Sequence, residues 1–309
     1  MLVSVCIASY QRPEGLKRLL VGLNQLVFCK SEVPDIEVIV VDNDETGSAS
    51  GICTDIETDF CWTLKYCIES QRGISFARNR AIASVSEYSN FVAFIDDDEV
   101  PENNWLDELL WVQKAYQADV VTAPVIPNFS KSDIPAWIVK GGFFEPRRYP
   151  TGQALEIAST NNVLIRTEVL RSVDPVFDER FAITGGEDTN LFMRLRRADY
   201  KFVWANDAIV REWIPQSRTN LKWVLQRGYF GWSVHSWCES ELYPSIPVIA
   251  IRIIKGLALI VKGLLLMLPS LFVGQHALIK ALLNIYRGAG TLAGIIGIRY
   301  QAYKVTHGV

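Results

Sequence analysis

A run of five apolar residues followed by four acids, Phe91-Val-Ala-Phe-Ile95 and then Asp96-Asp97-Asp98-Glu99, decides how this chain is interpreted. The apolar run predicts a buried strand that ends at the acidic cluster. Four adjacent carboxylates repel one another unless a cation neutralises them. Because carboxylate oxygens are hard ligands, the cation they suit is Mg²⁺ or Mn²⁺, with substrate phosphates and water completing the shell.

Two other interpretations of the acidic cluster stay open on the residues alone. The cluster can be a solvated acidic loop, or it can cap the helix expected at 103–116. An Asp-x-Asp pair after an apolar strand also resembles the nucleophile motif of haloacid-dehalogenase-type phosphatases, in which Asp96 would attack phosphorus and Asp98 would be the acid. That motif normally follows the first strand, whereas Ile95 ends the fourth strand expected here.

Strands and helices alternate on both sides of this run. Short apolar runs predict strands, and periodic apolar positions predict helices between them. The expected strands are 2–8, 36–41, 62–68, 91–95 and 119–125. Three helices are expected between them: one that begins at Pro13, one over 75–84 and one over 105–116. This order predicts an α/β domain with a mostly parallel central sheet flanked by helices. Ligands of such sheets bind beyond the carboxyl ends of the strands, where the loops 9–12, 42–44 and 96–99 are expected to meet.

The second half of the chain loses this alternation. Residues 124–150 are rich in Pro, Gly and aromatic residues and predict a long surface excursion. A strand is expected within 156–165, and helices are expected at 189–197 and 220–237. We expect two parts: an α/β domain over residues 1–240 and an apolar, basic helical tail over 241–309.

The charge distribution supports this division. The whole chain has a formal net charge of −3, which gives no indication of a nucleic-acid partner. Residues 1–241 hold 24 basic and 34 acidic residues, a net of −10, whereas residues 242–309 hold seven basic residues and no acid. A basic apolar tail on an acidic body predicts attachment to an anionic membrane surface. The six cysteines form no CxxC pair, so neither a zinc site nor a disulfide framework is expected.

Residues 246–273 are almost entirely apolar, interrupted by Arg252, Lys255, Lys262 and Pro269. A buried core helix is one interpretation. A transmembrane helix needs about 20 apolar residues, and Lys262 interrupts the best window. Helices that lie in the membrane interface, or a shallow hairpin whose lysines reach the head groups, fit the pattern better.

Five segments in order resemble family 2 glycosyltransferases of the GT-A fold, the nucleotide-diphospho-sugar transferase fold. They are Val3–Arg12, Val38–Asn43, Arg72–Asn79, Phe94–Asp98, which matches the DxD element, and Gly186–Thr189, which resembles the Glu-Asp catalytic motif. The resemblance spans roughly residues 2–235. Within the family the chain is most similar to the branch that builds bacterial exopolysaccharides on lipid carriers, such as the succinoglycan glycosyltransferases.

The resemblance implies a role for each matching residue. Donor-side residues would be Ser9, Tyr10, Arg12, Asp42, Gly73, Arg78, Asp96 and Asp97, of which Asp42 would read the uracil ring; for Asp97 a purely structural role is the alternative. Asp98 would bind the Mg²⁺ or Mn²⁺ that offsets charge on the leaving nucleoside diphosphate. Asp188 would be the base that takes the acceptor's proton, which gives inversion in one displacement. For Asp188 a helix N-terminal acid is the alternative.

Glu187, Trp137 and Glu212 are the residues expected on the acceptor side. The segment 187–214 has no histidine that could serve as an additional metal ligand, and Glu212 is the candidate to replace it. The Gln-x-x-Arg-Trp element of processive members is missing, because Arg218, Trp223 and Arg227 occur in another arrangement, so transfer of a single sugar is expected. The chain is thus expected to pass a hexose from a UDP-sugar to a lipid-linked or oligosaccharide acceptor at the cytoplasmic face of a bacterial inner membrane. An inactive membrane scaffold is the remaining alternative.

Overall fold

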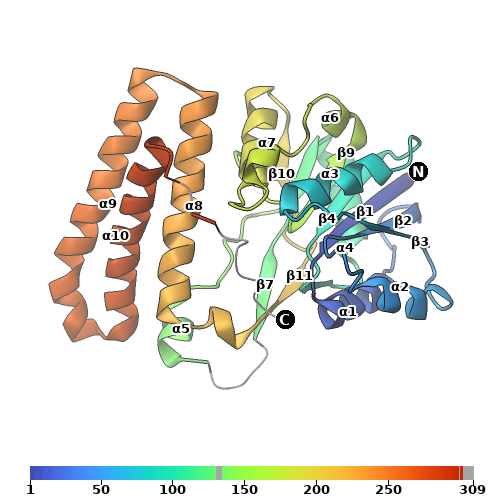
Figure 1. The fold of residues 1–309 in the computed structure, drawn as a ribbon, viewed down its shortest axis with the longest axis horizontal. Coiled ribbons are helices and arrows are strands. Elements are labelled where there is room, and N and C mark those ends of the chain that lie inside the picture. Colours follow the sequence, from blue (N-terminus) through green and yellow to red (C-terminus); the bar gives the residue numbers. More distant parts are fainter. Residues whose placement is uncertain (130–133, 299, 302–309) are drawn as a thin grey trace.

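The computed structural model describes residues 1–129, 134–298 and 300–301. A twisted sheet with helices on both faces stands beside a layer of long helices (Figure 1). The strands are β1 (Leu2–Ser9), β2 (Asp35–Asp42), β3 (Thr63–Ile68), β4 (Phe91–Ile95), β5 (Glu99–Pro101), β6 (Val120–Thr122), β7 (Val125–Phe129), β8 (Ala154–Leu155), β9 (Asn162–Arg166), β10 (Phe202–Trp204) and β11 (Val210–Ile214). The helices are α1 (Pro13–Leu23), α2 (Ser50–Glu57), α3 (Ile74–Ser84), α4 (Trp105–Tyr116), α5 (Ala136–Gly141), α6 (Thr167–Arg171), η1 (Glu179–Phe181), α7 (Glu187–Arg197), η2 (Gln216–Arg218), α8 (Leu221–Leu242), α9 (Ile246–Val273) and α10 (Gln275–Ile295).

The main sheet confirms the α/β prediction and has the strand order β3-β2-β1-β4-β9-β6-β10-β8. Strands β3, β2, β1 and β4 run parallel to one another. Strand β9 lies antiparallel between β4 and β6, so the sheet as a whole is mixed. The parallel strands bring the ends of β1 and β4 to the same edge, because Val3–Cys6 pair with Phe91–Phe94.

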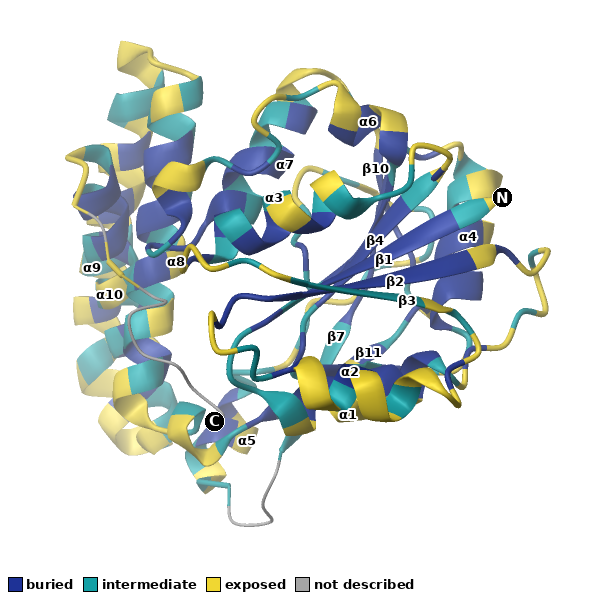
Figure 2. Cartoon of the chain, turned by 45° about the vertical axis from the view of Figure 1, so that its right-hand side comes forward, coloured by how far each residue is buried: buried dark blue, intermediate teal, exposed yellow. Residues whose placement is uncertain are grey.

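Both faces of the sheet are buried, which is why its strands are continuously apolar and not alternating. Val3, Val5 and Ile7 of β1 point to one face and pack against α1 and α4. Cys6, with Ile39 of β2, points to the other face, which α3, α6 and α7 cover. Figure 2 shows these strands as buried along most of their length.

Two of the predicted strands differ from the structure. The strand expected at 119–125 is divided into β6 and β7, which belong to different sheets. Pro124 stands at the division, and proline has no N–H to donate to a strand partner. Strand β7 joins β11 and β5 in a three-stranded sheet. The strand expected within 156–165 is shorter, and its observed part is β9.

Helices α8, α9 and α10 form the second layer, at the left of Figure 1, and α10 packs against both others. Glycines allow this close approach: a Cβ on Gly290 would lie 2.2 Å from the Tyr229 carbonyl oxygen of α8, and one on Gly288 would lie 2.4 Å from that of Gly256 of α9. Among the described residues, α9 is the helix long and apolar enough to cross a membrane, with a mean hydropathy of 2.2 over a window that is only 17% buried. Its exposure argues against a buried core helix.

A fully buried asparagine joins the sheet to the segments that lead to the second sheet. The amide nitrogen of Asn162 donates to the carbonyl oxygens of Pro124 (2.9 Å) and Ala208 (2.8 Å). Its Oδ1 atom accepts a hydrogen bond from Trp105 Nε1 of α4 at 2.8 Å. These groups are buried, so a lost hydrogen bond is not replaced by water; the Pro124 carbonyl also accepts the Val210 N–H at 3.3 Å.

Replacing Asn162 by alanine should therefore destabilise the fold. The substitution removes the hydrogen bonds that the Asn162 side chain makes to one indole N–H and to two carbonyl groups, all of them buried. We therefore expect a loss of about 3 kcal/mol in the free energy of unfolding. Urea denaturation followed by circular dichroism measures it. Asn103→Ala, at an exposed asparagine, is the matched control and should change stability by less than about 0.5 kcal/mol. Equal losses in the two variants would show that Asn162 does not hold the sheets together.

Candidate functional site

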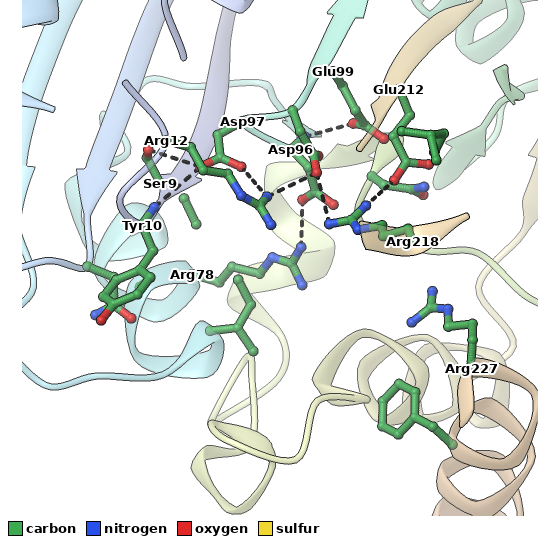
Figure 3. Close-up of a pocket in the computed structure, with 18 of the residues that line it drawn as sticks. Ser9, Tyr10, Arg12, Arg78, Asp96, Asp97, Glu99, Glu212, Arg218 and Arg227 are labelled. Atoms are coloured by element: carbon green, nitrogen blue, oxygen red, sulfur yellow. Dashed lines mark hydrogen bonds and ion pairs between the residues drawn. The ribbon is translucent and has the colours of Figure 1, made fainter. Parts of the chain in front are cut away.

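A cavity of about 460 Å³ lies where β1 and β4 end, bordered by the β11–η2 segment and the first turns of α8 (Figure 3). Of the residues expected at the site, Ser9, Tyr10, Arg12, Gly73, Arg78, Asp96, Asp97, Asp98 and Glu212 line it. Segments from the first and last thirds of the chain therefore meet here. The position agrees with the expectation for ligand sites of open α/β sheets.

Asp97, in the middle of the acidic cluster, ties the end of β4 to the end of β1. Its Oδ2 atom accepts hydrogen bonds from Ser9 Oγ (3.0 Å) and the Tyr10 N–H (3.3 Å), and Oδ1 accepts from Arg12 Nη1 at 2.9 Å. Burial raises the pKa of Asp97 to about 6, against the opposing attraction of Arg12. These contacts hold the β1–α1 loop in place, which agrees with a structural role for Asp97.

Helix α1 presses directly on this turn. A Cβ on Gly15 would lie 2.5 Å from the carbonyl oxygen of Asp97, so only glycine permits the contact. The pyrrolidine of Pro13 starts the helix, since its missing N–H is not needed at the first helical position. The sequence Arg12-Pro13-Glu14-Gly15 thus places the arginine and the acidic turn against each other.

Arg78 of α3 joins two carboxylates from different segments. Its guanidinium forms an ion pair with Asp96 (Nη2 to Oδ1, 2.9 Å) and a second with Glu187, at the start of α7. Glu187 is buried, and this burial raises its pKa to about 7 even though Arg78 opposes the shift. Arg78 and Glu187 therefore form the floor beneath Asp96, whose side chain remains 38% exposed toward the cavity.

Asp98 lies between two arginines. Its Oδ2 atom accepts hydrogen bonds from Arg12 Nη1 (3.0 Å) and from Arg218 Nη2 (3.1 Å). The other amino group of Arg218 binds Glu212 Oε1 at 2.6 Å. Figure 3 shows Arg12, Arg78 and Arg218 directed at the acidic cluster from three sides. The arginines supply part of the positive charge that the cluster requires.

Glu212 and Glu99 face each other because β11 and β5 are paired antiparallel with these two residues in register. Like charges directly opposite in a sheet repel. Burial, with the charge of Asp98, raises the pKa of Glu212 to about 7 against the pull of Arg218. Burial and the charge of Asp96 likewise raise the pKa of Glu99 well above its ordinary value. Among the described residues the cavity is lined by five carboxylates (Asp96, Asp97, Asp98, Glu99 and Glu212) and by five arginines (Arg12, Arg72, Arg78, Arg218 and Arg227).

The donor set fits a divalent cation by its chemistry, since Asp96, Asp98 and Glu212 offer only hard oxygen ligands, and burial together with the charge of Asp98 raises the pKa of Asp96 and of Glu212. In the conformation described, arginines occupy one oxygen of Asp98, and within residues 1–129, 134–298 and 300–301 no three His, Cys, Asp or Glu side chains are arranged as a ready metal site. A metal bound at Asp98 would therefore use the other carboxylate oxygen or displace the arginines from Oδ2.

Four predicted residues lie outside the cavity lining. Asp42 is fully buried and accepts hydrogen bonds from the Ala49 N–H (2.7 Å) and Tyr66 (3.1 Å), so its carboxylate is turned into its own loop. Glu187 lies behind Arg78. Trp137 packs edge-on against Phe143 (ring centres 5.3 Å apart) in an apolar cluster. Their assigned roles stay predictions.

The fourth such residue, Asp188, is half-buried at the first turn of α7. Its Oδ1 atom accepts hydrogen bonds from the Thr189 N–H (2.6 Å) and hydroxyl (3.3 Å). The other oxygen, Oδ2, accepts none from the described residues. Glu187 also has an oxygen, Oε2, with no hydrogen-bond partner among the described residues, but that atom is buried, so Asp188 is the more accessible carboxylate of the pair.

Other residues of the cavity had no assigned role in the sequence analysis. Arg72 stacks on the Tyr10 ring, with its guanidinium carbon 5.0 Å from the ring centre, and Arg218 binds the acidic cluster. Asn43, not Asp42, lines the cavity, and its Oδ1 atom accepts the Gly73 N–H at 2.7 Å. Arg72 and Asn43 lie inside the segments that resemble the family, so the resemblance could have assigned them to the site. Arg218 lies outside those segments, so the resemblance did not indicate it.

Comparisons with known proteins agree with the fold. The chain is 25% identical to the succinoglycan biosynthesis protein ExoM of Rhizobium meliloti over 98% of this chain and 97% of that protein. It is 28% identical to the pre-mycofactocin glycosyltransferase of Mycobacterium tuberculosis over 75% of this chain and 46% of that one. Crystal structures of S. aureus TarS 1–349 with UDP and with UDP-GlcNAc share the fold, with TM-scores of 0.53 and 0.52 at 15% identity, each over 94% of this chain and 90% of that one.

The model of the family described as glycosyl transferase family 2 matches residues 4–174, which include β1, the acidic cluster and the strands that carry them. This match covers more than half of the chain. It decides against the phosphatase interpretation of Asp96 and Asp98. The chain belongs to glycosyl transferase family 2 and is a glycosyltransferase.

Proposed function

We propose that this glycosyltransferase moves a hexose from a UDP-sugar to a lipid-linked glycan in the synthesis of a bacterial exopolysaccharide. The observation that carries the proposal is the cavity at the ends of β1 and β4, where Asp96 and Asp98 face Arg12, Arg78 and Arg218. Arginines suit the diphosphate of a donor, because a planar guanidinium binds phosphate through two parallel hydrogen bonds. The UDP and UDP-GlcNAc complexes of TarS and the succinoglycan role in the name of ExoM support the donor and the pathway.

In this proposal, Tyr10 and Arg72 bind the nucleotide, and Asp96 contacts the ribose or the sugar. Asp98, with Asp96 and Glu212 beside it, would hold Mg²⁺ or Mn²⁺, which when bound offsets the charge of the leaving diphosphate. Release of Asp98 leaves the Arg218 guanidinium beside the diphosphate, where a positive charge is most useful during transfer. Arg78 keeps Asp96 in position from below.

Asp188 is our candidate for the base that deprotonates the acceptor hydroxyl, and one base opposite the leaving group gives inversion. Its half-buried position supports this choice over Glu187, which is buried and paired with Arg78. Glu212 is the competing carboxylate, since it lines the cavity and has a pKa of about 7.

The tail places the enzyme beside its acceptor in this proposal. Helix α9 exposes Leu265 (71%), Leu268 (73%) and Phe272 (93%), which is unfavourable in water and favourable in lipid. With the basic residues of 242–309, this surface supports attachment to the cytoplasmic face of the inner membrane, whose lipids are anionic.

The first test is donor turnover. We expect purified protein with Mn²⁺ to release UDP from one of a panel of UDP-sugars, and Asp98→Ala to lower the rate by about a hundredfold or more, because it removes a ligand of the metal that offsets the charge of the leaving diphosphate. Asp207→Ala, at an exposed aspartate far from the cavity, is the control and should keep full activity. Phosphate release from monoesters without UDP formation would sink the proposal. Membrane binding with neither activity would indicate an inactive scaffold.

The second test assigns the base. Asp188→Asn keeps the shape of the side chain but cannot take a proton, so kcat should fall by about 10²- to 10⁴-fold while the affinity for UDP is unchanged. Glu212→Gln should have a smaller effect on kcat. Steady-state kinetics and calorimetric UDP binding on both variants give the comparison. Loss of kcat in Glu212→Gln with activity retained in Asp188→Asn would transfer the base to Glu212.

The third test uses the pKa of Glu212, which is about 7 in the folded protein. A carboxylate whose pKa is raised by folding stabilises the fold at low pH, and this contribution is lost as the pH rises through 7. Glu212→Gln carries no charge at any pH. In EDTA, its stability relative to wild type should therefore increase by about 2 kcal/mol between pH 5 and pH 8 in urea denaturation. Glu156→Gln, at an exposed glutamate, should show no such trend, and a flat difference for Glu212→Gln would contradict the raised pKa.

A further inference from the structure

A second cavity, of about 780 Å³, lies among α8, α9, α10 and the segment after α5. We call it the basic cavity, because Arg147, Arg227, Arg252, Lys280 and Arg287 line it. Glu145 is the one carboxylate among the described residues of its lining. Nothing in the transfer of a sugar from the donor cavity requires these cations.

Most of this positive charge has no ion-pair partner within the part of the chain that the structure describes. Arg252 forms an ion pair with Glu239. In contrast, Arg147, Lys280 and Arg287 form no ion pair with any residue of 1–129, 134–298 or 300–301. The Nε atom of Arg287 is buried and has no hydrogen-bond partner there. Burial, with the nearby charge of Arg147, lowers the pKa of Arg287, so the two guanidiniums lie close enough to repel each other.

Such an arrangement is unfavourable without an anion, because like charges in a partly buried place repel more strongly than in water. A phosphate or diphosphate group would compensate it, since arginine binds phosphate oxygens through charge-assisted hydrogen bonds. The basic cavity is therefore suited to a ligand with two or more negative charges.

The basic cavity neighbours the donor cavity. Phe143, Trp223 and Arg227 line both. The Trp223 ring is stacked with that of Phe144, with ring centres 5.3 Å apart and planes inclined by 10°, and aromatic rings suit the apolar faces of sugars. In Figure 3, Arg227 reaches from α8 toward the donor-side residues. One ligand can thus extend from the basic cavity past Trp223 to the acidic cluster.

The helix that contributes Arg252 to the basic cavity also carries the apolar surface of the tail. Leu257 and Ile254 of α9 are exposed, and they project from the side of the helix opposite Arg252, because they follow it by five and two positions. An anionic head group in the cavity would therefore lie about one helix diameter, ~10 Å, from the apolar surface, a distance that a long hydrocarbon chain spans. The phosphate, glycan and hydrocarbon parts of a glycolipid would thus each have a matching part of the protein.

We propose that the basic cavity binds the phosphate head group of the membrane lipid that carries the acceptor glycan. The glycan then passes Trp223 and Phe143 and presents its terminal hydroxyl at the donor cavity. This inference rests on the proposed function, because it takes the acceptor to be lipid-linked. Bulk anionic phospholipid offers the same phosphate chemistry, and the experiment distinguishes the two sources.

The experiment measures binding of farnesyl diphosphate to the full-length protein in a neutral detergent by calorimetry, with UDP present at saturation to block the donor cavity. Wild type should bind it. Lys280→Ala and Arg287→Ala should each weaken binding by about ten- to a hundredfold, the loss of one charge-assisted phosphate contact. UDP affinity, measured separately, should be unchanged. Lys280 is exposed, so its variant guards against misfolding of the Arg287 variant.

Lys262→Ala is the matched control, since Lys262 is an exposed lysine of α9 outside the basic cavity. It should leave farnesyl diphosphate binding unchanged but lower binding to phosphatidylglycerol vesicles as much as Lys280→Ala does. Equal loss of farnesyl diphosphate binding in both lysine variants would overturn the proposal, as would no binding by wild type. A loss in Lys280→Ala confined to the vesicles would assign the cavity to bulk lipid and overturn it too. Absence of UDP binding in wild type would instead show that the proposed function has failed.

Discussion

The buried carboxylate of Asp97 is the constraint on which the site depends. Burying a charge costs free energy unless donors surround it, and here Ser9, Tyr10 and Arg12 all donate to one side chain. These contacts join the ends of β1 and β4, so the loops that follow both strands share one geometry. Because Asp97 points inward, its neighbours Asp96 and Asp98 point outward into the cavity. The acidic cluster thus has two buried members, Asp97 and Glu99, and two members, Asp96 and Asp98, available to a ligand.

The sheet strands and the position of the acidic cluster could be predicted because local pattern determines them. Each parallel strand is a short apolar run that ends in a polar loop, and the carboxyl ends of parallel strands meet at one edge. The expected strand 91–95 matches β4, and the expected helix 105–116 matches α4. The family resemblance added which loops belong together, and the match of residues 4–174 to the family model confirms it.

The pairing of charges could not be predicted, because it depends on contacts between distant segments. Arg218 binds Asp98 across 120 positions of sequence, in a segment without a recognisable pattern. Glu212 faces Glu99 only because β11 joins β5 in a small second sheet, and that sheet exists because Pro124 ends β6. Asp42 illustrates the opposite error. An aspartate at a strand end looks available to a ligand, yet the turn that follows it satisfies its carboxylate completely.

Helix α8 fixes the distance between the donor cavity and the helices of the tail. Its first turns, with Trp223 and Arg227, border the donor cavity, and its 22 residues make it about 33 Å long. The backbone of α10 touches it at Gly290, and contacts between glycine and backbone leave no side chain that could yield by changing rotamer. The apolar surface of α9 is therefore held at a set height relative to the donor cavity. Under the proposed function, this fixed distance sets a minimum length for the acceptor glycan. A glycan shorter than this distance would not reach the transferred sugar, so the length of the glycan becomes a criterion of acceptor choice.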